Sequence, residues 1–201
     1  MIHQRIKKAK QIEPDTGWHS RGYLPHFDGN EIIQFITFRL ANSLPRHFLQ
    51  SLKLKLESRH ISEIEYHRAI ELYLDKSHGY DHLKNEIVAS IVEENLLHFD
   101  GQRYKLLHWV IMSNHIHLLL KATAGFTLAS IMHSMKSYTS NQANKVLGTS
   151  GRFWSVEYFD RYIRNAAHYS KTVAYIHENP VKAGLCEKST DWRFGCARWH
   201  E

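Results

Sequence analysis

Two histidines, His115 and His117, stand one residue apart at the start of the run HIHLLL. Residues i and i+2 of a β-strand point to the same face, so both imidazoles project together while Ile116 points to the other face. Two imidazoles placed in this way can bind a divalent metal ion. The spacing alone fits two hydrogen-bonded structural histidines equally well, and other residues must decide between these interpretations.

Tyr175 and Asn179 are one turn apart on a predicted helix, which makes their side chains neighbours. They belong to a polar stripe with His168 and Thr172, beside an apolar stripe that contains Ile176. A tyrosine hydroxyl, with an ordinary pKa near 10, is a weak nucleophile unless a base or a metal ion assists it. Near the histidine pair, this tyrosine could attack a phosphodiester whose charge the same ion offsets. Tyr175 is one of ten tyrosines, so a packing role stays open.

The elements that must position these residues follow from hydrophobic periodicity and from breakers. Ser113 and Asn114 form a predicted tight turn between two apolar strands, so the histidines begin the second strand of a hairpin. Asn165 is a good N-cap for the tyrosine helix, and Pro180 should stop that helix after Asn179. The remaining pattern predicts strands at 31–40, 104–112 and 157–163, helical segments at 46–74 and 82–98, and a helix after 125 that ends by 148.

This order of elements, with a hairpin that must be antiparallel, predicts the α+β class. The fold expected is ferredoxin-like (βαββαβ), an antiparallel sheet with helices on one face, plus a C-terminal helix that carries the tyrosine. A chain of 201 residues with 43% hydrophobic residues can build one domain with a real core. We expect a flexible basic arm at 1–20, one domain at 21–195 with the helical segment 46–98 between its first two strands, and a tail at 196–201.

Composition narrows the class of partner. The formal net charge of +6 favours a polyanion such as nucleic acid, although an ordinary basic protein would also fit. No apolar run is long enough for a membrane span, and the polar N-terminal stretch is not a secretory signal. The two cysteines, Cys186 and Cys196, do not form a disulfide framework, and their roles stay open. We expect a cytoplasmic protein with no membrane partner.

The stretch RFWSVEYFDRYIR, residues 152–164, combines aromatic and cationic side chains. Such a mixture suits single-stranded nucleic acid, in which bases stack on rings and arginines hold phosphates. Phe153, Trp154 and Phe159 could equally be core residues, and Arg161 could pair with a neighbouring carboxylate. From charge and position, the candidates for DNA contacts are Arg21, His26, Arg152, Arg161, Arg164 and Lys182.

Three blocks together resemble a known family. VIMSNHIHLLL is similar to the HUH motif (histidine, apolar residue, histidine) of single-tyrosine transposases. RFWSVEYFDRYIRN followed by AYIHENPVKAG resembles the C-terminal signature of the REP-associated tyrosine transposases (RAYTs), and RGYLPHFD followed by FITFRL is similar to their N-terminal part. The blocks occur in the family's order and span roughly residues 21–195.

The resemblance implies a metal-dependent DNA endonuclease and strand transferase that cuts single-stranded DNA beside REP-type hairpins. Tyr175 matches the family nucleophile, which leaves a 5′-phosphotyrosine intermediate and a free 3′-OH. His115 and His117 match the metal-binding histidines, and Asn179 matches the polar residue that completes the site. The ion would be Mg²⁺ or Mn²⁺, and imidazole suits Mn²⁺ somewhat better. The protein would be bacterial and nucleoid-associated, either a monomer, which we favour, or a homodimer.

Two departures from the family pattern stand out. Ser113 occupies a position where relatives commonly carry proline, and KSHGYDHL (76–83) lacks their Cys-Trp-Leu pattern, which bears on hairpin contacts.

Two other functions fit the residues. One is a domesticated protein that binds hairpin DNA or RNA without cutting it, and the other is a hydrolase whose ion activates water without a covalent step.

Overall fold

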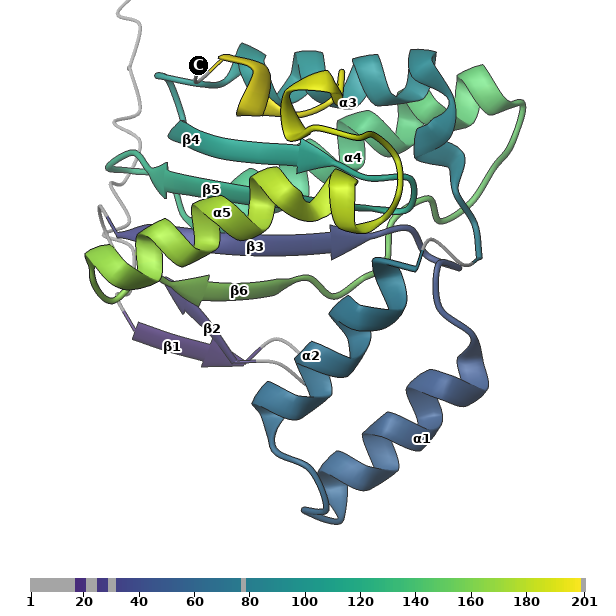
Figure 1. Cartoon of the computed structure of the whole chain (residues 1–201), viewed down its shortest axis with the longest axis vertical. Coiled ribbons are helices and arrows are strands. Elements are labelled where there is room, and N and C mark those ends of the chain that lie inside the picture. The colour runs from purple at the N-terminus through teal and green to yellow at the C-terminus, as the bar shows by residue number, and fades with distance from the viewer. Residues whose placement is uncertain (1–16, 21–24, 29–31, 77–78, 200–201) are drawn as a thin grey trace, which may run out of the picture.

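A four-stranded antiparallel sheet forms the centre of the molecule (Figure 1). The computed structural model describes residues 32–76 and 79–199 in full, and residues 17–20 and 25–28 as backbone only. The order across the sheet is β4-β5-β3-β6. These strands are β3 (Ile33–Arg39), β4 (Tyr104–Ile111), β5 (His115–Ala122) and β6 (Phe159–Tyr162). A separate two-stranded ribbon pairs β1 (Gly17–Ser20) with β2 (Pro25–Asp28).

Helices cover both faces of the sheet (Figure 1). The five α-helices are α1 (Arg46–Glu57), α2 (Glu63–Leu74), α3 (Glu86–His98), α4 (Leu128–Leu147) and α5 (Ala166–Lys182). Helices α3 and α4 pack on one face, and α5 lies across the other. The predicted ferredoxin-like βαββαβ core, with an added C-terminal helix, is confirmed.

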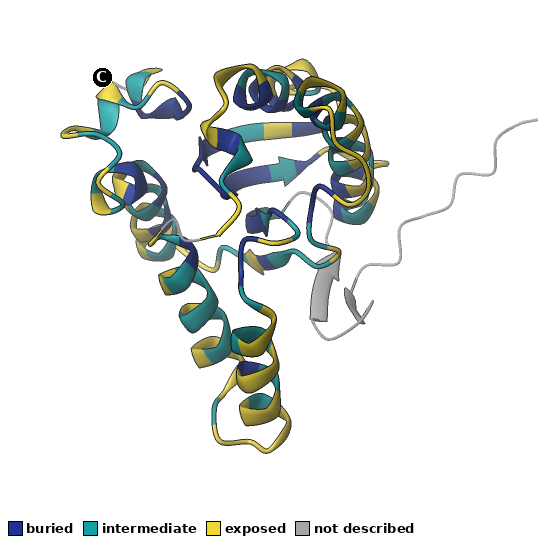
Figure 2. Ribbon diagram, turned by 90° about the vertical axis from the view of Figure 1, so that its right-hand side faces the viewer, coloured by how far each residue is buried: buried dark blue, intermediate teal, exposed yellow. Residues whose placement is uncertain are grey.

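Alternate residues of β5 belong to two different cores. Ile116, Leu118 and Leu120 pack under α3 and α4, whereas Leu119 packs under α5, and all four side chains are fully buried. Burial of one such side chain contributes about 1.5–3 kcal/mol, so a shift of register by one residue would be strongly opposed. The register therefore fixes which face His115 and His117 occupy. Figure 2 shows the buried residues concentrated in and around this sheet.

The predicted turn is tight and buried. Met112 N–H donates to the His115 carbonyl at 2.9 Å, which closes the hairpin over Ser113 and Asn114. The carbonyls of these two turn residues accept hydrogen bonds from the backbone of Leu83 and Leu40. Two other segments therefore hold this turn in place without a proline in it.

Helix α5 begins as expected and ends later than expected. Asn165 is the N-cap, and its side chain accepts from His168 N–H at 2.9 Å. The predicted stop at Pro180 is wrong, because the helix continues to Lys182 with the proline inside it. In the last turn the missing N–H removes only one helical bond. The Asn179 carbonyl still accepts from Ala183 at 3.0 Å, and that of Pro180 accepts from Leu185 at 2.9 Å.

The helical segment 46–74 is two helices that project from the sheet as a hairpin (Figure 1). Helix α1 ends near Ser58, and Arg59 takes a left-handed conformation with φ of 57°. Ser62 and Glu65 then form a capping box that starts α2. At the other end of α2, Leu74 is fully buried and fixes the helix terminus against the body of the protein.

The sequence predicts an N-terminal arm at 1–20 and a C-terminal tail at 196–201. Residues 1–16 of the predicted arm lie outside the described residues, and Gly17–Ser20 pairs with β2. Cys196–Trp199, expected as a tail, forms the short 3₁₀ helix η3, in which Cys196 and Ala197 are buried. Two further 3₁₀ turns are η1 (His82–Lys84) and η2 (Ser189–Asp191).

In the described part of the chain, no helix has the length and apolar character needed to cross a membrane.

Candidate functional site

The two histidines of β5 point at each other beneath α5. The Nε2 atoms of His115 and His117 are 3.0 Å apart, and both side chains are fully buried. The Phe35 ring stacks on the His117 ring with centroids 5.4 Å apart. Burial, followed by the proximity of His115, holds the pKa of His117 well below its ordinary value. His117 is therefore neutral at physiological pH and has a lone pair to offer.

Hydrogen bonds at the opposite nitrogens orient these rings. His115 Nδ1 lies 2.7 Å from the Asn114 side-chain oxygen, which can only accept, so Nδ1 carries the proton and Nε2 is bare. His117 Nδ1 lies 2.8 Å from the Thr37 hydroxyl, which can accept its proton in the same way. In the tautomer in which both Nδ1 atoms carry protons, the two bare Nε2 atoms, 3.0 Å apart, would repel each other unless a cation or a proton lies between them. In metal sites, a hydrogen bond to the ring nitrogen that does not bind the metal fixes the tautomer of the histidine.

Asp75 brings an oxygen donor to the pair, and Asn179 lies next to Tyr175 on α5. Asp75, just after α2, has its Oδ1 atom 3.5 Å from His115 Nε2, and a single position could reach Asp75, His115 and His117 together. This oxygen and both amide atoms of the fully buried Asn179 are buried without a hydrogen-bond partner. Each such atom costs about 1–3 kcal/mol if it is left unsatisfied. A set of imidazole and oxygen donors with orphaned oxygens fits a divalent cation.

Tyr175 of α5 faces this cluster. Its hydroxyl is 3.4 Å from His117 Nε2, and its ring packs edge-on against Phe35 at 5.9 Å. Burial raises the pKa of the hydroxyl far above its ordinary value, and the carboxylates of Glu71 and Asp75 add to this effect. Asn179 and Arg161 offset part of the rise. The resting tyrosine is neutral, so it can act as a nucleophile only if a cation or a base assists it.

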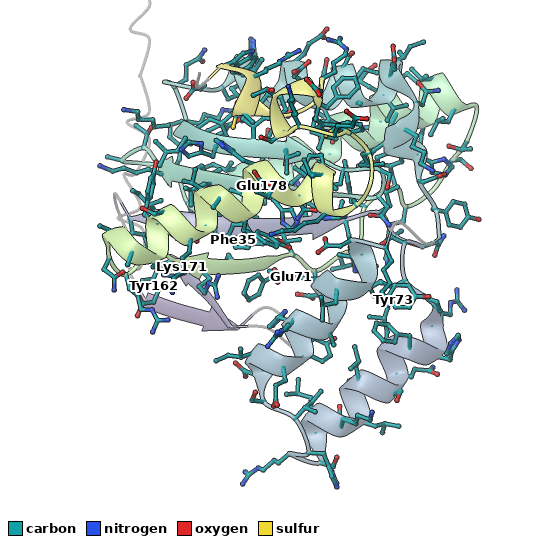
Figure 3. The ribbon with its side chains drawn as sticks, in the orientation of Figure 1. Phe35, Glu71, Tyr73, Tyr162, Lys171 and Glu178 are labelled. Atoms are coloured by element: carbon teal, nitrogen blue, oxygen red, sulfur yellow. The ribbon has the colours of Figure 1, made fainter. Side chains whose placement is uncertain are left out.

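A cavity of about 550 Å³ opens beside Tyr175 between α5 and α2. Figure 3 labels three side chains that line it: Phe35 from β3, Glu71 from α2 and Lys171 from α5. Arg161 and Arg164 also line it and are exposed, which gives the opening an excess of positive charge. Burial raises the pKa of Glu71 to about 7, Arg161 opposes the shift and Asp75 adds to it. The cavity can accept an anion and holds a carboxyl group that titrates near neutral pH.

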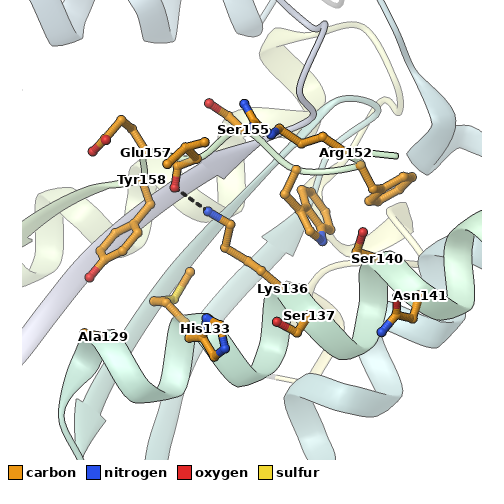
Figure 4. Close-up of a pocket in the computed structure, with 14 residues that line it drawn as sticks. Ala129, His133, Lys136, Ser137, Ser140, Asn141, Arg152, Ser155, Glu157 and Tyr158 are labelled. Atoms are coloured by element: carbon orange, nitrogen blue, oxygen red, sulfur yellow. Dashed lines mark hydrogen bonds between the residues drawn. The ribbon is translucent and has the colours of Figure 1, made fainter. Parts of the chain in front are cut away.

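The remaining candidates for DNA contacts lie in different places. Lys182 is exposed, with its Nζ atom 5.8 Å from the centre of the Tyr175 ring. Arg152 lies apart from this site, at a second cavity of about 590 Å³ between α4 and residues 152–158 (Figure 4). Arg21 lies outside the described residues, and of His26 only the backbone is described.

The aromatic stretch 152–164 is divided between core and surface. Phe153 and Trp154 are buried and belong to the core, and the Trp154 indole donates to the Thr139 hydroxyl at 2.9 Å. Phe159 is partly buried and packs on the α5 side. Tyr158 lines the second cavity opposite Lys136, whose ammonium donates to the Val156 carbonyl (Figure 4). The core interpretation is therefore right for the first two aromatic residues.

The structure brings together His115, His117, Tyr175 and Asn179, all of which sequence reasoning had named. It adds Asp75 and Glu71, which lie in a helical segment that reads as ordinary surface pattern. Asp75 precedes His115 by forty positions in the sequence. Only the packing of α2 against the sheet brings its carboxylate to the histidines. The sequence does give a signal for Asn114. An asparagine side chain in a turn often forms a hydrogen bond with a residue next to it, here His115.

One family model matches this chain. The family model described as "Transposase IS200 like" matches residues 60–179, more than half of the chain, and its span contains Asp75, both histidines, Tyr175 and Asn179. A search of curated proteins finds no match.

Two solved structures match this chain at low sequence identity. One is described as the REP-associated tyrosine transposase bound to a REP hairpin; it has a TM-score of 0.58 and 17% identity, and the match covers 89% of this chain and 84% of that one. The other is a candidate transposase from Deinococcus radiodurans R1, with a TM-score of 0.34 and 14% identity over 80% of this chain and 95% of that one. The first likeness shows the fold, and the second is too weak to support an argument. By the match over residues 60–179, this chain belongs to the IS200-like transposase family.

Proposed function

We propose that this protein is a divalent-metal-dependent endonuclease and strand transferase that cuts single-stranded DNA at REP-type hairpins through a covalent bond to Tyr175. The observation that carries the proposal is the convergence of the half-buried Tyr175 hydroxyl with two buried histidines and the Asp75 carboxylate. The fold shared with a transposase that was solved with a REP hairpin supports this class of substrate.

His115, His117, Asp75 and Asn179 would hold the ion. Mg²⁺ or Mn²⁺ bound there would offset the charge of the scissile phosphate and position it. The neutral imidazoles favour Mn²⁺, and the carboxylate and amide oxygens suit either ion. The family requirement for an ion is thus matched by donors from three separate elements.

In the proposed reaction, the Tyr175 oxygen attacks phosphorus and the bond from phosphorus to the upstream 3′ oxygen breaks. The downstream DNA keeps its 5′ phosphate, now joined to the tyrosine, and the upstream 3′ oxygen leaves and takes a proton from solvent to become a 3′-OH. We assign the tyrosine proton to the Glu71 carboxylate, because a group whose pKa is about 7 can accept a proton near neutral pH. Arg161, Arg164 and Lys171 at the cavity mouth would hold the flanking phosphates.

Every residue of this site comes from one chain, since α5 packs on the sheet that carries His117. The arrangement needs no helix from a second copy. We therefore propose that a monomer carries out the cleavage step.

A cleavage assay with DNA labelled at either end tests the proposal. The substrate is a synthetic hairpin with a single-stranded 5′ flank, incubated with Mn²⁺ and run on a denaturing protein gel. We expect a 3′-end label to migrate with the protein and a 5′-end label to be released in a shorter fragment. His115→Ala should abolish both products and leave hairpin binding largely intact, because phosphate contacts provide most of the affinity.

The same assay separates the two other functions. A protein that only binds hairpins would shift the DNA on a native gel and give no shorter fragment. A hydrolase that activates water would release fragments with both labels free of protein. Either result would reject the covalent mechanism.

A further inference from the structure

A second cluster of potential metal ligands lies on the α5 side of the sheet, away from the catalytic histidines. It consists of His108 from β4, His177 from α5 and Cys196 from η3. His108 Nδ1 is 3.0 Å from His177 Nε2, and the Cys196 sulfur is 3.8 Å from the former nitrogen and 3.6 Å from the latter. Three side chains from distant parts of the sequence thus present one atom each to a common point.

These three distances are close to the edges of a zinc coordination tetrahedron. With Zn–N bonds of about 2.0–2.1 Å and Zn–S bonds of about 2.3 Å, nitrogens lie about 3.3 Å apart and nitrogen and sulfur about 3.6 Å apart. Two imidazoles and a thiolate are also a donor set that selects zinc over Mg²⁺ or Mn²⁺. We infer that His108, His177 and Cys196 form a zinc site, with a solvent molecule as the fourth ligand.

The surroundings of the cluster prepare it for a cation. His108 Nε2 lies 3.1 Å from the Tyr169 hydroxyl, which can take the proton of that nitrogen, so that the lone pair of Nδ1 faces His177 and Cys196. The Trp109 N–H donates to the Cys196 sulfur at 3.1 Å. Cys196 is 2% exposed, and burial raises its thiol pKa, so without a cation the sulfur stays protonated and chemically inert. His177 is only partly buried, which leaves room for a solvent ligand.

The backbone already holds Cys196 in position. Ile111 N–H donates to the Phe194 carbonyl at 2.8 Å, and the Trp192 indole donates to the Ile111 carbonyl at 3.0 Å. The segment before η3 is therefore paired with β4 beside His108. A zinc ion here would join β4, the tyrosine helix and the C-terminal segment. His177 lies two residues after Tyr175, so the ion would also fix the rotation of the helix that carries the nucleophile.

This site shares no ligand with the site proposed for DNA cleavage. Cys196 lies beyond residues 60–179, which match the family model, and it does not contact the His115–His117 pair. The other cysteine, Cys186, is outside the cluster and provides a matched control for the loss of a thiol.

Cobalt titration of the purified, metal-free protein tests the inference. Co²⁺ bound through a thiolate gives a charge-transfer band in the near ultraviolet, and zinc added afterwards should displace it at one equivalent. We expect this band in the wild-type protein, in Cys186→Ser and in His117→Ala, and its loss in Cys196→Ser. Elemental analysis after purification should likewise find zinc in the wild-type protein, in Cys186→Ser and in His117→Ala, and little or none in Cys196→Ser.

Because Cys196 is buried, Cys196→Ser could fail to fold, and a second variant provides an independent test. His177→Asn changes a partly exposed side chain and should weaken zinc binding by about tenfold or more while the protein keeps its circular dichroism spectrum. Zinc should raise the urea midpoint of the wild-type protein and have little effect on that of His177→Asn. The inference is overturned if wild-type protein gives no thiolate band, or if binding is lost in His117→Ala and kept in Cys196→Ser. A hydrogen-bonded triad without an ion would give the first of these results.

Discussion

At the scale of single residues, the candidate site depends on atoms that the protein alone leaves unsatisfied. Asp75 Oδ1, which lies 3.5 Å from His115 Nε2, and the amide of Asn179 are buried without hydrogen-bond partners, and the two histidine Nε2 atoms face each other at 3.0 Å. Folding brings these groups together at a cost in free energy. A bound cation would remove that cost, so each of these residues should affect ion affinity more than it affects stability.

Asp75→Asn should weaken Mn²⁺ binding by about tenfold or more, because it removes a charged oxygen ligand and keeps the side-chain shape. Isothermal titration calorimetry, or the signal of free Mn²⁺ in electron paramagnetic resonance, measures this affinity. Asp81→Asn is the control, since Asp81 forms an exposed ion pair with Lys84 at 2.7 Å. Equal affinity in both variants would remove Asp75 from the ligand set.

Glu71→Gln should change how stability depends on pH. The pKa of Glu71 is raised to about 7 in the folded protein, so between its unfolded value near 4.3 and about 7 the folded state binds more protons. Stability contributed by this group is present at low pH and is lost as pH rises through about 7. In metal-free protein, urea unfolding at pH 5 and pH 8 should therefore show that the glutamine variant gains stability over wild type at the higher pH. An unchanged difference between the two pH values would mean that Glu71 titrates normally.

At the scale of elements, the described fold follows the sequence wherever periodicity is strong. The alternation around Ile116 and Leu119 predicts a strand buried on both faces, and Asn165 starts its helix as expected. Pro180 was misread because the rule for helix interiors was applied to a last turn, where only one hydrogen bond is lost.

The contribution of α2 could not be predicted in the same way. Nothing local distinguishes Asp75 from other acidic residues at the end of a helix. Its role depends on how α2 packs against α5 and the sheet, which is a tertiary contact. The same holds for Cys196, which reads as part of an irregular tail and is nonetheless buried beside His108.

The buried end of α2 should determine whether Asp75 reaches the site. Leu74→Ala removes a fully buried side chain and should lower the free energy of unfolding by about 2–5 kcal/mol. Leu72→Ala is the matched control: Leu72 is 56% exposed, and its loss should change stability by no more than about 0.5 kcal/mol. Urea denaturation compares the two variants. Similar losses in both would show that α2 is not fixed through Leu74.

At the scale of the whole molecule, charge and shape fit a nucleic-acid partner. The net charge is +6, and exposed Arg161, Arg164 and Lys171 surround the cavity that leads to Tyr175. The α1–α2 hairpin projects from the body (Figure 1) and contributes Glu71 to the lining of this cavity. A strand that enters here would meet positive charge before it meets the tyrosine.

Binding of hairpin DNA should therefore weaken steeply with salt. If about five cationic side chains meet single-stranded phosphates, the slope of log affinity against log salt should be about −3 to −4. Arg161→Ala and Arg164→Ala should each make the slope shallower by slightly less than one unit. Fluorescence anisotropy with a labelled hairpin that has a 5′ flank gives these slopes, and plain duplex is the comparison. An affinity that does not change between low and physiological salt would argue against this surface.

The central claim is that Tyr175 is the nucleophile, and mapping of the covalent adduct tests it most directly. The protein is incubated with Mn²⁺ and the flanked hairpin, digested, and the peptide that carries a nucleotide is sequenced by mass spectrometry. We expect a 5′-phosphate linked to Tyr175, no adduct in Tyr175→Phe, and an undiminished adduct in Tyr162→Phe. An adduct on any other residue, or one that persists in Tyr175→Phe, would contradict it.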